Sequence, residues 1–588
     1  MGGANDNVPA VETTWRLPHR DPEADGVLAE RLGSSRVLAA LLRNRGLDDP
    51  VAARAWVQPR LRDLSHPYEI ADLERGAERL RKAIKDRERI VVYGDYDVDG
   101  MTGTVILMNF VHLAGGRCEF KIPNRLKEGY SFNDEAIEHF LAAEEPPGLV
   151  LTVDHGTSAV DGIAKLADAG VDVVVTDHHE PPAILPDRAH ALINPRRKDD
   201  HSPFKSLCGA AVAYKLAWGT AEAFSGQRKL DPAFREFLLD AMGMVSLATV
   251  TDVVPLVGEN RVLCFHGLRA LPVSNNHGLK ALLSASRLQR GIVRAAHVAF
   301  RIGPRINAAG RMGEAELAIE LLTTPDPDRA KTLAKRLETA NDRRRSLEKE
   351  MMREILALPE IKNHEPGRAI CLGRRGWHPG VIGIVAARLV DRFSVPSLVV
   401  GLAGDKSRAS ARSVDGVNVK EVLDDVSEHL IAWGGHAGAA GATVDAQAFP
   451  ALKIAFEDRA SEVHAASGVV PSLDIDLELP FRAIRPELIE ELERLAPHGE
   501  ANPPAMFSTH GVEVAGKPQI IGGERGHLVF HARHDGRTFR AFAPGMRDQR
   551  ELLRRPGVRV DLAYRLKFDS YADPGAIELE IAALRPSD

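Results

Sequence analysis

The sequence contains little cysteine and few aromatic residues. Only 4 cysteines occur among 588 residues, at positions 118, 208, 264 and 371, and aromatic residues make up 5%. The cysteines are far apart and show no C-x-x-C spacing, so neither a disulfide framework nor a cysteine zinc site is indicated. A reducing compartment fits this cysteine usage best.

The sequence also has no apolar run long enough to cross a bilayer. Its first residues, MGGANDNVPAVETTW, show no basic region followed by an apolar stretch, which a secretory signal would require. We therefore expect a soluble, cytoplasmic protein with no membrane partner.

What the sequence does contain is enough apolar material for several hydrophobic cores. Hydrophobic residues make up 44% and charged residues 27% of the 588 residues. A single core rarely grows beyond about 250–300 residues, so two to four domains are expected. This composition excludes both a single small module and disorder over most of the length.

Charge is distributed unevenly along the chain. The net charge of -6 would on average repel nucleic acid. Between Lys517 and Arg559, however, ten Lys/Arg face four acidic residues. This segment fits either an Arg-rich solvated surface or a site for a polyanion.

The pattern of apolar residues predicts an α/β protein in five segments. We expect an N-terminal extension (1–72), an α/β domain with a parallel sheet (73–299), a linking segment with a long helix (300–358), a second α/β domain (359–465) and a small β-barrel (466–588). Continuous apolar strands alternating with helices are typical of a parallel sheet covered on both faces. Short alternating strands after about residue 470 favour a barrel.

Acidic residues follow the expected strands of the first α/β domain. We expect strands at 89–93, 148–153 and 171–176, and a further buried run at 242–251. The residues that follow these runs are Asp95, Asp97 and Asp99, then Asp154 and His155, then Asp177, His178 and His179, and finally Asp252. Because ligand sites of such sheets lie beyond the carboxyl ends of the strands, these side chains are expected to gather at one edge.

Such a gathering of carboxylates indicates bound cations. A single Asp after a strand is often only a helix cap or a turn residue. Four such positions together would repel one another strongly unless cations lay among them. Carboxylates with one imidazole suit Mn²⁺ or Mg²⁺ better than Zn²⁺ or Cu²⁺. A dinucleotide site is disfavoured because no G-x-G-x-x-G follows the first strand, and because these carboxylates would repel a pyrophosphate.

The motifs in this order resemble a known group of enzymes. The D-Y-D-V-D-G block, Asp154, the D-H-H block and Asp252 are similar to the four motifs of the DHH phosphoesterase superfamily. With GPRINAAGR, GWHPGVIGIVAARL, ARSVDGVN and GGHAGAAG in order, the chain resembles the bacterial RecJ family of single-stranded-DNA-specific exonucleases. The resemblance implies a DHH catalytic domain, a DHH-associated domain beyond a long helix, and a C-terminal OB fold. It also implies 5′→3′ hydrolysis of single-stranded DNA to mononucleotides, in DNA repair and recombination.

The resemblance also implies a pair of metal ions, Mn²⁺ or Mg²⁺. Asp97 and Asp154 would hold one ion, and Asp99, Asp154, His178 and Asp252 the other, with Asp154 shared. Beside these ligands, His179 would contact the scissile phosphate and Asp177 would orient the two histidines. Asp95 would support the ligands or simply form the turn.

The chain departs from the superfamily pattern at two positions. Many members have histidine where this chain has Tyr93, so the first ion has fewer expected ligands. His155 stands where the superfamily usually has asparagine, as an additional hydrogen-bond donor or a plain substitution.

Other motifs are candidates for binding substrate phosphates. Arg305, Asn307 and Arg311 surround an expected tight turn, and a guanidinium can bind a phosphate through two hydrogen bonds. The alternative is that these arginines pair with acids across a domain joint. In the second α/β domain the phosphate-binding candidates are His378, Arg412, Ser413 and His436, which the resemblance places at a 5′-end or backbone phosphate.

The basic barrel is a candidate for binding single strands. Its arginines are interleaved with Phe530, Phe539, Phe542, Tyr564 and Phe568, which suits electrostatic attraction combined with base stacking. Some of these rings must belong to the barrel core, and alternation alone does not say which.

Two other functions compete with this interpretation. One is a DHH phosphodiesterase acting on short oligoribonucleotides or cyclic dinucleotides, against which the length and the basic barrel argue. The other is a non-catalytic replication scaffold of the same fold, against which the complete set of expected ligands argues. We expect single-stranded DNA as the substrate, with a single-strand-binding protein and a helicase as candidate partners.

Overall fold

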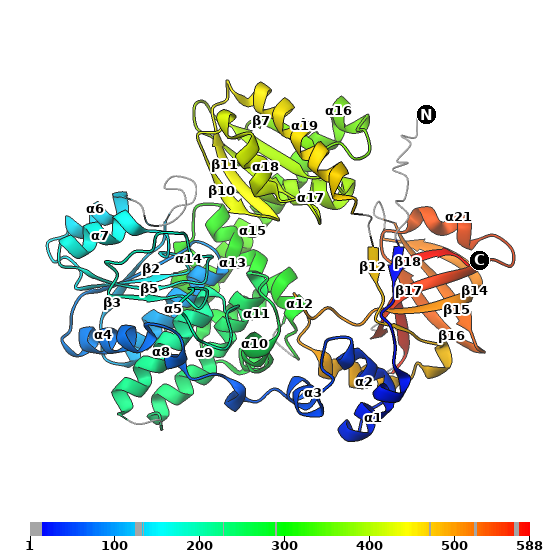
Figure 1. The fold of residues 1–588 in the computed structure, drawn as a ribbon, viewed down its shortest axis with the longest axis horizontal. Coiled ribbons are helices and arrows are strands. Elements are labelled where there is room, and N and C mark those ends of the chain that lie inside the picture. The colour runs from blue at the N-terminus through cyan, green and yellow to red at the C-terminus, as the bar shows by residue number, and fades with distance from the viewer. Residues whose placement is uncertain are drawn as a thin grey trace. The chain divides into compact units, whose positions relative to one another are not determined.

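The computed structural model describes residues 14–123, 132, 134–226, 229–288, 291–469, 472–522, 526–569 and 575–587. The chain divides into two compact units, one of residues 64–469 and one that joins residues 1–63 to residues 470–588. The fold is mixed α/β with a C-terminal barrel, as predicted (Figure 1). No helix of the described residues is long and apolar enough to span a membrane.

The first domain of unit 64–469 is built on a five-stranded parallel sheet in the order β3-β2-β4-β5-β6. Its strands are β2 (Ile90–Gly94), β3 (Cys118–Lys121), β4 (Leu149–Val153), β5 (Asp172–Thr176) and β6 (Ala191–Ile193). All residues of β2 and β4 are buried because helices cover both faces of the sheet. This confirms the predicted parallel sheet.

Helices surround this sheet and then continue into an all-helical region. The helices are α4 (Leu73–Lys85), α5 (Val98–Leu113), α6 (Asp134–Leu141), α7 (Val160–Asp168), α8 (Gly209–Ser225), α9 (Pro232–Thr251), α10 (Gly258–Ala270) and α11 (His277–Ala285). Figure 1 shows α6 and α7 on one face of the sheet and α4, α5 and α8 on the other. On the first face, Val91 and Tyr93 of β2 pack with Ile137 and Phe140 of α6 and with Ile163 of α7.

Asp252 does not follow a strand, contrary to the sequence prediction. The buried run before it forms helix α9, and Asp252 is the C-cap of that helix. A short apolar run buried on all sides has the same composition in a helix as in a strand, so periodicity could not separate the two.

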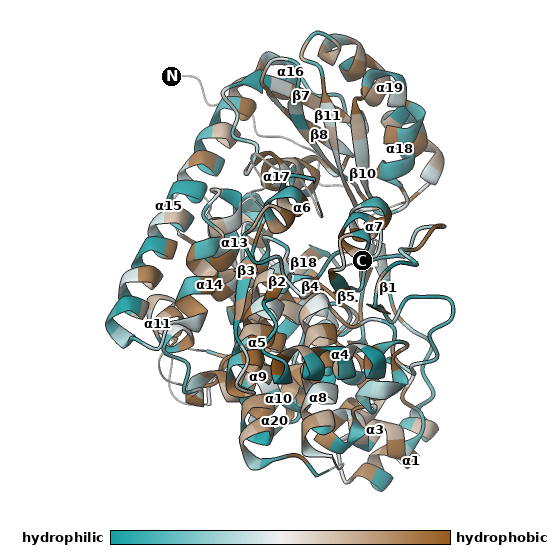
Figure 2. Ribbon diagram, turned by 90° about the vertical axis from the view of Figure 1, so that its left-hand side faces the viewer, coloured by the Kyte–Doolittle hydropathy of each residue, from teal (hydrophilic) through white to brown (hydrophobic). Residues whose placement is uncertain are grey.

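The linking segment is mostly helical, including the part expected to be a tight turn. It consists of α12 (Ala295–His297), η4 (Val298–Ile302), α13 (Gly303–Arg311), α14 (Glu316–Thr323), α15 (Pro327–Ala357) and α16 (Pro359–Lys362). The residues Gly303 and Pro304 open α13, where proline at the first turn lacks only an N–H that would have no helical partner. The predicted long helix is α15, which has 31 residues and alternates hydrophilic and hydrophobic colour along its length in Figure 2.

The second α/β domain of this unit has a mixed five-stranded sheet in the order β10-β11-β9-β8-β7. Its elements are β7 (Ile370–Arg375), α17 (Ile382–Phe393), β8 (Ser397–Leu402), β9 (Ser407–Arg412), α18 (Val419–Asp425), β10 (Ala432–His436), β11 (Ala439–Val444) and α19 (Phe449–Ser467). All five residues of β10, at one edge of the sheet, are exposed.

The other unit is a closed five-stranded barrel. Its strands are β14 (Phe507–Ile521), β15 (His527–His534), β16 (Arg537–Ala543), β17 (Arg559–Phe568) and β18 (Ile577–Pro586), and the pairing of β14 with β17 closes the barrel. Shorter elements are β12 (Ser472–Asp474), β13 (Leu477–Glu478), α20 (Pro486–Leu492) and α21 (Arg550–Leu553). This confirms the predicted OB-type barrel.

The N-terminal segment packs on this barrel. Its elements are β1 (Thr14–Arg16), α1 (Pro22–Leu32), α2 (Arg36–Arg43) and α3 (Pro50–Val57). Strand β1 pairs in parallel with β12, and Leu38 and Leu41 of α2 share one hydrophobic core with Phe481 and Phe507. Residues 14–63 are therefore part of the barrel unit, which differs from the expected extension leading into the first α/β domain. The boundaries of the five predicted segments otherwise stay predictions.

Candidate active site

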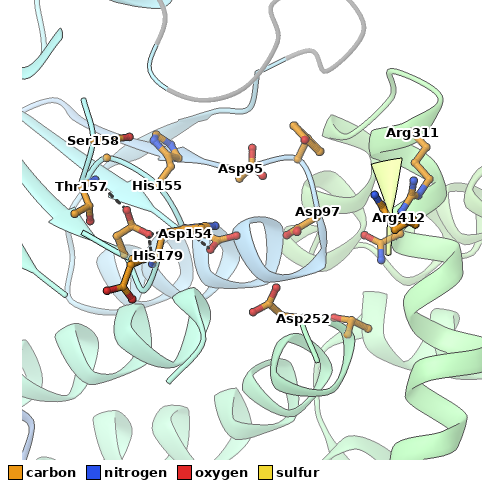
Figure 3. Close-up of a pocket in the computed structure, with 16 residues that line it drawn as sticks. Asp95, Asp97, Asp154, His155, Thr157, Ser158, His179, Asp252, Arg311 and Arg412 are labelled. Carbon is orange, nitrogen blue, oxygen red and sulfur yellow. Dashed lines mark hydrogen bonds and ion pairs between the residues drawn. The ribbon is translucent and has the colours of Figure 1, made fainter. Parts of the chain in front are cut away.

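A cavity of about 490 Å³ lies at the carboxyl ends of β2, β4 and β5, within unit 64–469 (Figure 3). Its lining residues are Asp95, Tyr96, Asp97, Asp154, His155, Gly156, Thr157, Ser158, Asp177, His179, Glu180, Thr251, Asp252, Asn307, Arg311 and Arg412. The cavity therefore combines the predicted acidic edge with arginines from α13 and β9. In Figure 3, His179 and Arg412 lie on opposite sides of the carboxylates of Asp154, Asp97 and Asp252.

Of the three aspartates after β2, Asp97 and Asp99 are fixed by the ends of two helices. Asp97 is the N-cap of α5, and its Oδ1 accepts hydrogen bonds from the backbone N–H groups of Asp99 and Gly100 at 2.9 and 3.1 Å. Asp99 is buried, and its two carboxylate oxygens accept from the N–H groups of Gly209 and Ala210, both at 2.6 Å. Because these two N–H groups open α8, they favour the ionised Asp99 carboxylate and hold it in one orientation.

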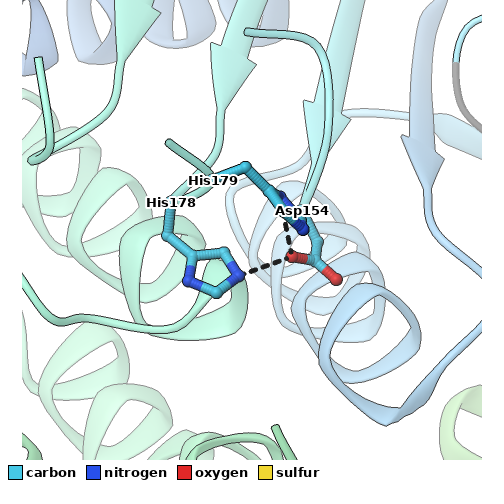
Figure 4. Close-up of side chains that lie close together, drawn as sticks. All are labelled: Asp154, His178 and His179. Atoms are coloured by element: carbon cyan, nitrogen blue, oxygen red, sulfur yellow. Dashed lines mark ion pairs between the residues drawn. The ribbon is translucent and has the colours of Figure 1, made fainter. Parts of the chain in front are cut away.

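Asp154 stands at the centre of the site in a backbone conformation that few residues adopt. Its φ angle is 66°, in the left-handed region, where Asp and Asn are better tolerated than most residues. Oδ1 of Asp154 lies 3.0 Å from Nε2 of His178, yet neither buried atom has a hydrogen-bond partner. Figure 4 shows both histidines directed toward Asp154. Two buried atoms with lone pairs directed at one place fit ligation of a shared cation.

Three overlapping groups of side chains could hold metal ions. They are Asp95 with Asp97 and Asp154, Asp99 with His178 and Asp252, and Asp154 with His178 and His179, each with ligand atoms within 4.8 Å of one another. Nε2 of His178 lies 3.6 Å from both Asp99 Oδ2 and Asp252 Oδ2. Carboxylates outnumber imidazoles, so this donor set fits Mn²⁺ or Mg²⁺. The Asp95 carboxylate lies among the potential ligands rather than behind them.

Without cations the carboxylates disfavour one another's charge. Burial and the neighbouring Asp97 raise the pKa of Asp99 to about 7, although the α8 N–H groups oppose this shift. Burial and the charges of Asp99 and Asp97 raise the pKa of Asp252 to about 9, and burial raises the pKa of Asp154 well above its usual value. Divalent ions would remove this repulsion, which supports the metal interpretation.

The two histidines of the D-H-H block have opposite electrostatic surroundings. Burial and the neighbouring His179 lower the pKa of His178 to about 3, so His178 is neutral and suited to ligation. Burial also opposes the charged form of His179, but the hydrogen bond from its Nδ1 to Asp177 Oδ1, at 2.8 Å, raises its pKa to about 9. His179 is thus a cation, half-exposed at the cavity.

Asp177 makes hydrogen bonds that orient the two histidines, and it is not one of the potential metal ligands among the described residues. One carboxylate oxygen accepts from the backbone N–H groups of His178 and His179, and the other accepts from the N–H of Thr157. Burial would raise the pKa of Asp177, but the hydrogen bond and the charge of the His179 ring, together with the hydrogen bonds from Thr157, hold it below its usual range. Asn194 completes the network, because its side-chain amide donates to the His179 carbonyl at 2.9 Å and to the Thr157 hydroxyl at 3.0 Å.

The two positions that depart from the superfamily pattern contact each other. The rings of Tyr93 and His155 meet edge to face, with centroids 4.8 Å apart. Nε2 of His155 donates to the Tyr93 carbonyl at 2.9 Å, and burial lowers the pKa of His155 to about 4. His155 is therefore neutral, and it is not part of any of the three ligand groups in the described residues.

Arg311, Asn307 and Arg412 lie at the opposite end of the cavity. Asn307 Oδ1 accepts from the backbone N–H of Val98 at 3.2 Å, which ties α13 to the start of α5. Arg311 Nη1 donates to the Gly380 carbonyl at 3.3 Å, and a Cβ at Gly380 would lie 2.2 Å from the Arg311 carbonyl. Glycine at position 380 thus lets the second α/β domain approach α13 closely enough to bring Arg412 to the cavity.

Four predicted phosphate-binding residues do not line this cavity. Arg305 pairs with an acid, Glu338 of α15, but this partner lies in the same linking segment rather than across a domain joint, and the guanidinium also donates to the Arg301 carbonyl. Nδ1 of His378 accepts from the Gly380 N–H, and the Ser413 hydroxyl donates to the Val417 carbonyl. His436 stacks near His179, with ring centroids 6.5 Å apart, and so borders the site from β10.

Sequence reasoning missed the groups that support the ligands. Asn194 and the first residues of α8 carry no motif of charged residues. Asn194 does follow the buried strand β6, which is where a polar side chain at a strand end could have been noticed. Arg196, two residues after Asn194, was also not among the predicted site residues.

The barrel divides its aromatic residues between core and surface. Phe530 and Tyr564 are buried in the barrel core, whereas Phe568 is 39% exposed. Arg533 and Arg559 both pair with Glu513, so part of the excess charge is neutralised locally. Of the charged residues counted in this segment, Glu524 and Arg525 lie outside the described residues.

Three family models match the chain in the predicted order. They are the DHH family N-terminal domain at residues 89–242, the DHHA1 domain at residues 367–462 and the RecJ OB domain at residues 475–583. The chain resembles the single-stranded-DNA-specific exonuclease RecJ of Bacillus subtilis, with 34% identity over 84% of this chain and 61% of that protein. RecJ of Thermus thermophilus is 35% identical over 81% of this chain and 67% of its own length.

A solved structure agrees with these relatives. The crystal structure of RecJ from Thermus thermophilus in complex with Mn²⁺ matches with a TM-score of 0.81 and 32% identity, over 98% of this chain and 80% of that one. The chain spans about three fifths of the length of the Bacillus relative, 61%, and larger shares of the others, such as 83% of RecJ from Dickeya dadantii at 33% identity. On these matches the chain belongs to the RecJ family of DHH proteins.

Proposed function

We propose that this protein is a metal-dependent exonuclease that hydrolyses single-stranded DNA from the 5′ end to mononucleotides. The observation that carries the proposal is one cavity in which the carboxylates of Asp97, Asp154 and Asp252 face the guanidinium groups of Arg311 and Arg412. Carboxylates that hold divalent ions next to arginines that attract phosphate are what phosphodiester hydrolysis requires.

The proposed ligand assignment follows the clusters in the site. Asp97 and Asp154, joined by Asp95, hold one ion, while Asp99, Asp154, His178 and Asp252 hold the other. When bound, the ions supply positive charge to the scissile phosphate and lower the pKa of the attacking water. No ligand needs to move far, because the α5 and α8 helix ends already fix Asp97 and Asp99.

The remaining side chains position the strand. His179, charged through its hydrogen bond to Asp177, donates to a non-bridging oxygen of the scissile phosphate. Arg311 and Arg412 receive the terminal 5′ phosphate on the far side of the carboxylates. The bond between phosphorus and the 3′ oxygen of the first nucleotide breaks, so the first nucleotide leaves with its own 5′ phosphate.

The proposal includes a role for other proteins and a place of action. A single-strand-binding protein and a helicase would provide the single strand, since we expect a site bounded by both α/β domains to admit one strand and exclude a duplex. The four free cysteines agree with a reducing compartment, and we propose the cytoplasm. The scaffold alternative is not favoured, because all the expected ligand residues are present and gathered.

The test is a time course with Mn²⁺ on single strands labelled at one end or the other. We expect labelled mononucleotide first from the 5′ end, and Arg412→Ala to lower kcat/KM by about ten- to a hundred-fold, as for loss of a charge-assisted contact. Arg408→Ala is the matched control, because Arg408 lies on the same strand outside the cavity. Early release from the 3′ end, or internal fragments, would contradict the proposed polarity.

A further inference from the structure

A second, basic cavity adjoins the active site. Its volume is about 440 Å³, and its lining residues are Glu180, Pro195, Arg196, Arg197, Lys205 and Ser206. Glu180 also lines the active-site cavity, so the two cavities share a border. Glu180 directly follows His179 in the chain, and Figure 3 shows His179 on the opposite side of the carboxylates from Arg412.

The three cations of this cavity are not equivalent. Arg197 pairs with Asp72 at 2.7 Å and with Asp199, and Lys205 pairs with Asp200. Among the described residues Arg196 pairs with one carboxylate, that of Glu180, at 3.8 Å, and the Glu180 side chain is 71% exposed. The charge of Arg196 is therefore the one most available to an incoming anion.

The backbone of Arg196 is tied to the catalytic loop. Its N–H donates to Asn194 Oδ1 at 2.9 Å, and the amide nitrogen of the same Asn194 side chain donates to the His179 carbonyl. The Asn194 side chain is completely buried, so this link is rigid.

We infer that this cavity binds the phosphodiester that follows the scissile one in the strand, with Arg196 as its principal contact. The inference rests on the proposed function. If the terminal phosphate is held at Arg412 and the scissile phosphate lies at the carboxylates, the strand continues past His179 and Glu180 to Arg196. A guanidinium presents two parallel donors, which matches the oxygens of a phosphodiester.

This subsite predicts a dependence on substrate length. A 5′-phosphorylated dinucleotide has one internal phosphodiester, the scissile one, and cannot reach Arg196. A 5′-phosphorylated trinucleotide has a second internal phosphodiester that can. Removing the guanidinium should therefore impair hydrolysis of the trinucleotide and leave hydrolysis of the dinucleotide unchanged.

The experiment compares Arg196→Gln with the full-length wild type on both substrates in Mn²⁺. We expect kcat/KM on the trinucleotide to fall by about ten- to a hundred-fold, and kcat/KM on the dinucleotide to change by less than about two-fold. Lys198→Gln is the matched control, because Lys198 is an exposed residue of the same loop outside the cavity. Arg196→Lys, which keeps the charge but not the two parallel donors, should recover part of the loss.

A second experiment measures, by calorimetry and without metal, how tightly the wild type and Arg196→Gln bind the two oligonucleotides. Without metal no turnover occurs, so this comparison reports binding alone. In the wild type the trinucleotide should bind more tightly than the dinucleotide, with a steeper salt dependence, and Arg196→Gln should remove that difference. If Arg196→Gln lowered kcat/KM equally on both substrates, Arg196 would act at the metal centre instead. If it lowered kcat/KM on neither substrate, the proposed subsite would be wrong. A wild type that binds both oligonucleotides but hydrolyses neither would contradict the proposed function and leave the binding comparison as the test of the subsite.

Discussion

Asp154 combines a buried carboxylate with a left-handed backbone, and this combination limits which substitutions are informative. Its side chain is 4% exposed, its φ is 66°, and its Oδ1 faces His178 at 3.0 Å. A change to alanine would remove the ligand and strain the backbone together. Asparagine tolerates the left-handed region and has nearly the same shape, so it removes the negative charge and one acceptor oxygen without altering the backbone conformation.

We expect Asp154→Asn to abolish hydrolysis while the protein stays folded, because the shared ligand of both ions loses its charge. Thermal unfolding provides the second measurement. Mn²⁺ at about a hundred times its dissociation constant should stabilise the wild type by about 2.7 kcal/mol, and should stabilise the variant much less. Turnover like that of the wild type at saturating Mn²⁺ would refute the shared-ligand assignment.

At the residue scale the sequence predicted acidic residues better than basic ones. The carboxylates were predictable because each follows a buried run, and the topology of a parallel sheet brings such positions together. Arg305 and Arg311 belong to the same motif, yet one pairs with Glu338 and the other lines the cavity. A guanidinium reaches several partners from one backbone position, so its partner depends on packing that the motif does not specify.

Helix ends do much of the positioning at the scale of elements. Backbone N–H groups in the first turn of α5 donate to the Asp97 carboxylate, and those in the first turn of α8 donate to the Asp99 carboxylate. The expectation that strand ends alone build the site was therefore incomplete. Asp252, at the C-cap of α9, was expected after another strand, and only the burial of the run before it was predictable.

The helices α1 to α3 belong to the barrel unit, and this assignment predicts the effect of a core substitution. Leu38 of α2 is completely buried in the core that includes Phe481 and Phe507. We expect Leu38→Ala to destabilise the barrel unit by about 2–5 kcal/mol, the usual cost of a cavity at a buried leucine. Hydrogen exchange of β14 and β17 should accelerate, while exchange in β2 and β4 stays unchanged.

Val27→Ala provides the control for this substitution. Val27 lies on α1 and is 52% exposed, so the change should have little effect on exchange anywhere. If Leu38→Ala accelerated exchange only within residues 14–63, these helices would not stabilise the barrel.

At the scale of the whole molecule, the sequence predicted the order of domains. It did not predict that the N-terminal segment packs on the C-terminal barrel. Amphipathic helices in residues 22–57 show that they have a buried face. They do not show that the covering surface lies more than 400 residues away, where Ser472 pairs with Thr14. Local patterns identify elements, whereas contacts between distant segments depend on the complete fold.

The two units predict a division of labour that can be tested by cutting between them. Because residues 14–63 share the barrel core, removing the barrel alone would expose Leu38 and its neighbours. The informative fragment is therefore residues 64–469, which form one compact unit and contain the whole active-site cavity. Every predicted metal ligand is retained in it.

We expect this fragment to hydrolyse short oligonucleotides at a rate close to that of the full chain. Its affinity for long single strands should fall, and the logarithm of its binding constant should depend less steeply on salt. Each phosphate contact that is lost reduces the slope by about 0.7 for single strands. The contacts that remain are those of the active site, whereas the exposed arginines and Phe568 of the barrel are absent.

Binding is measured by fluorescence anisotropy at several salt concentrations, with circular dichroism to verify folding. A folded fragment that binds long strands as tightly, and with the same slope, as the full chain would show that the barrel does not bind DNA.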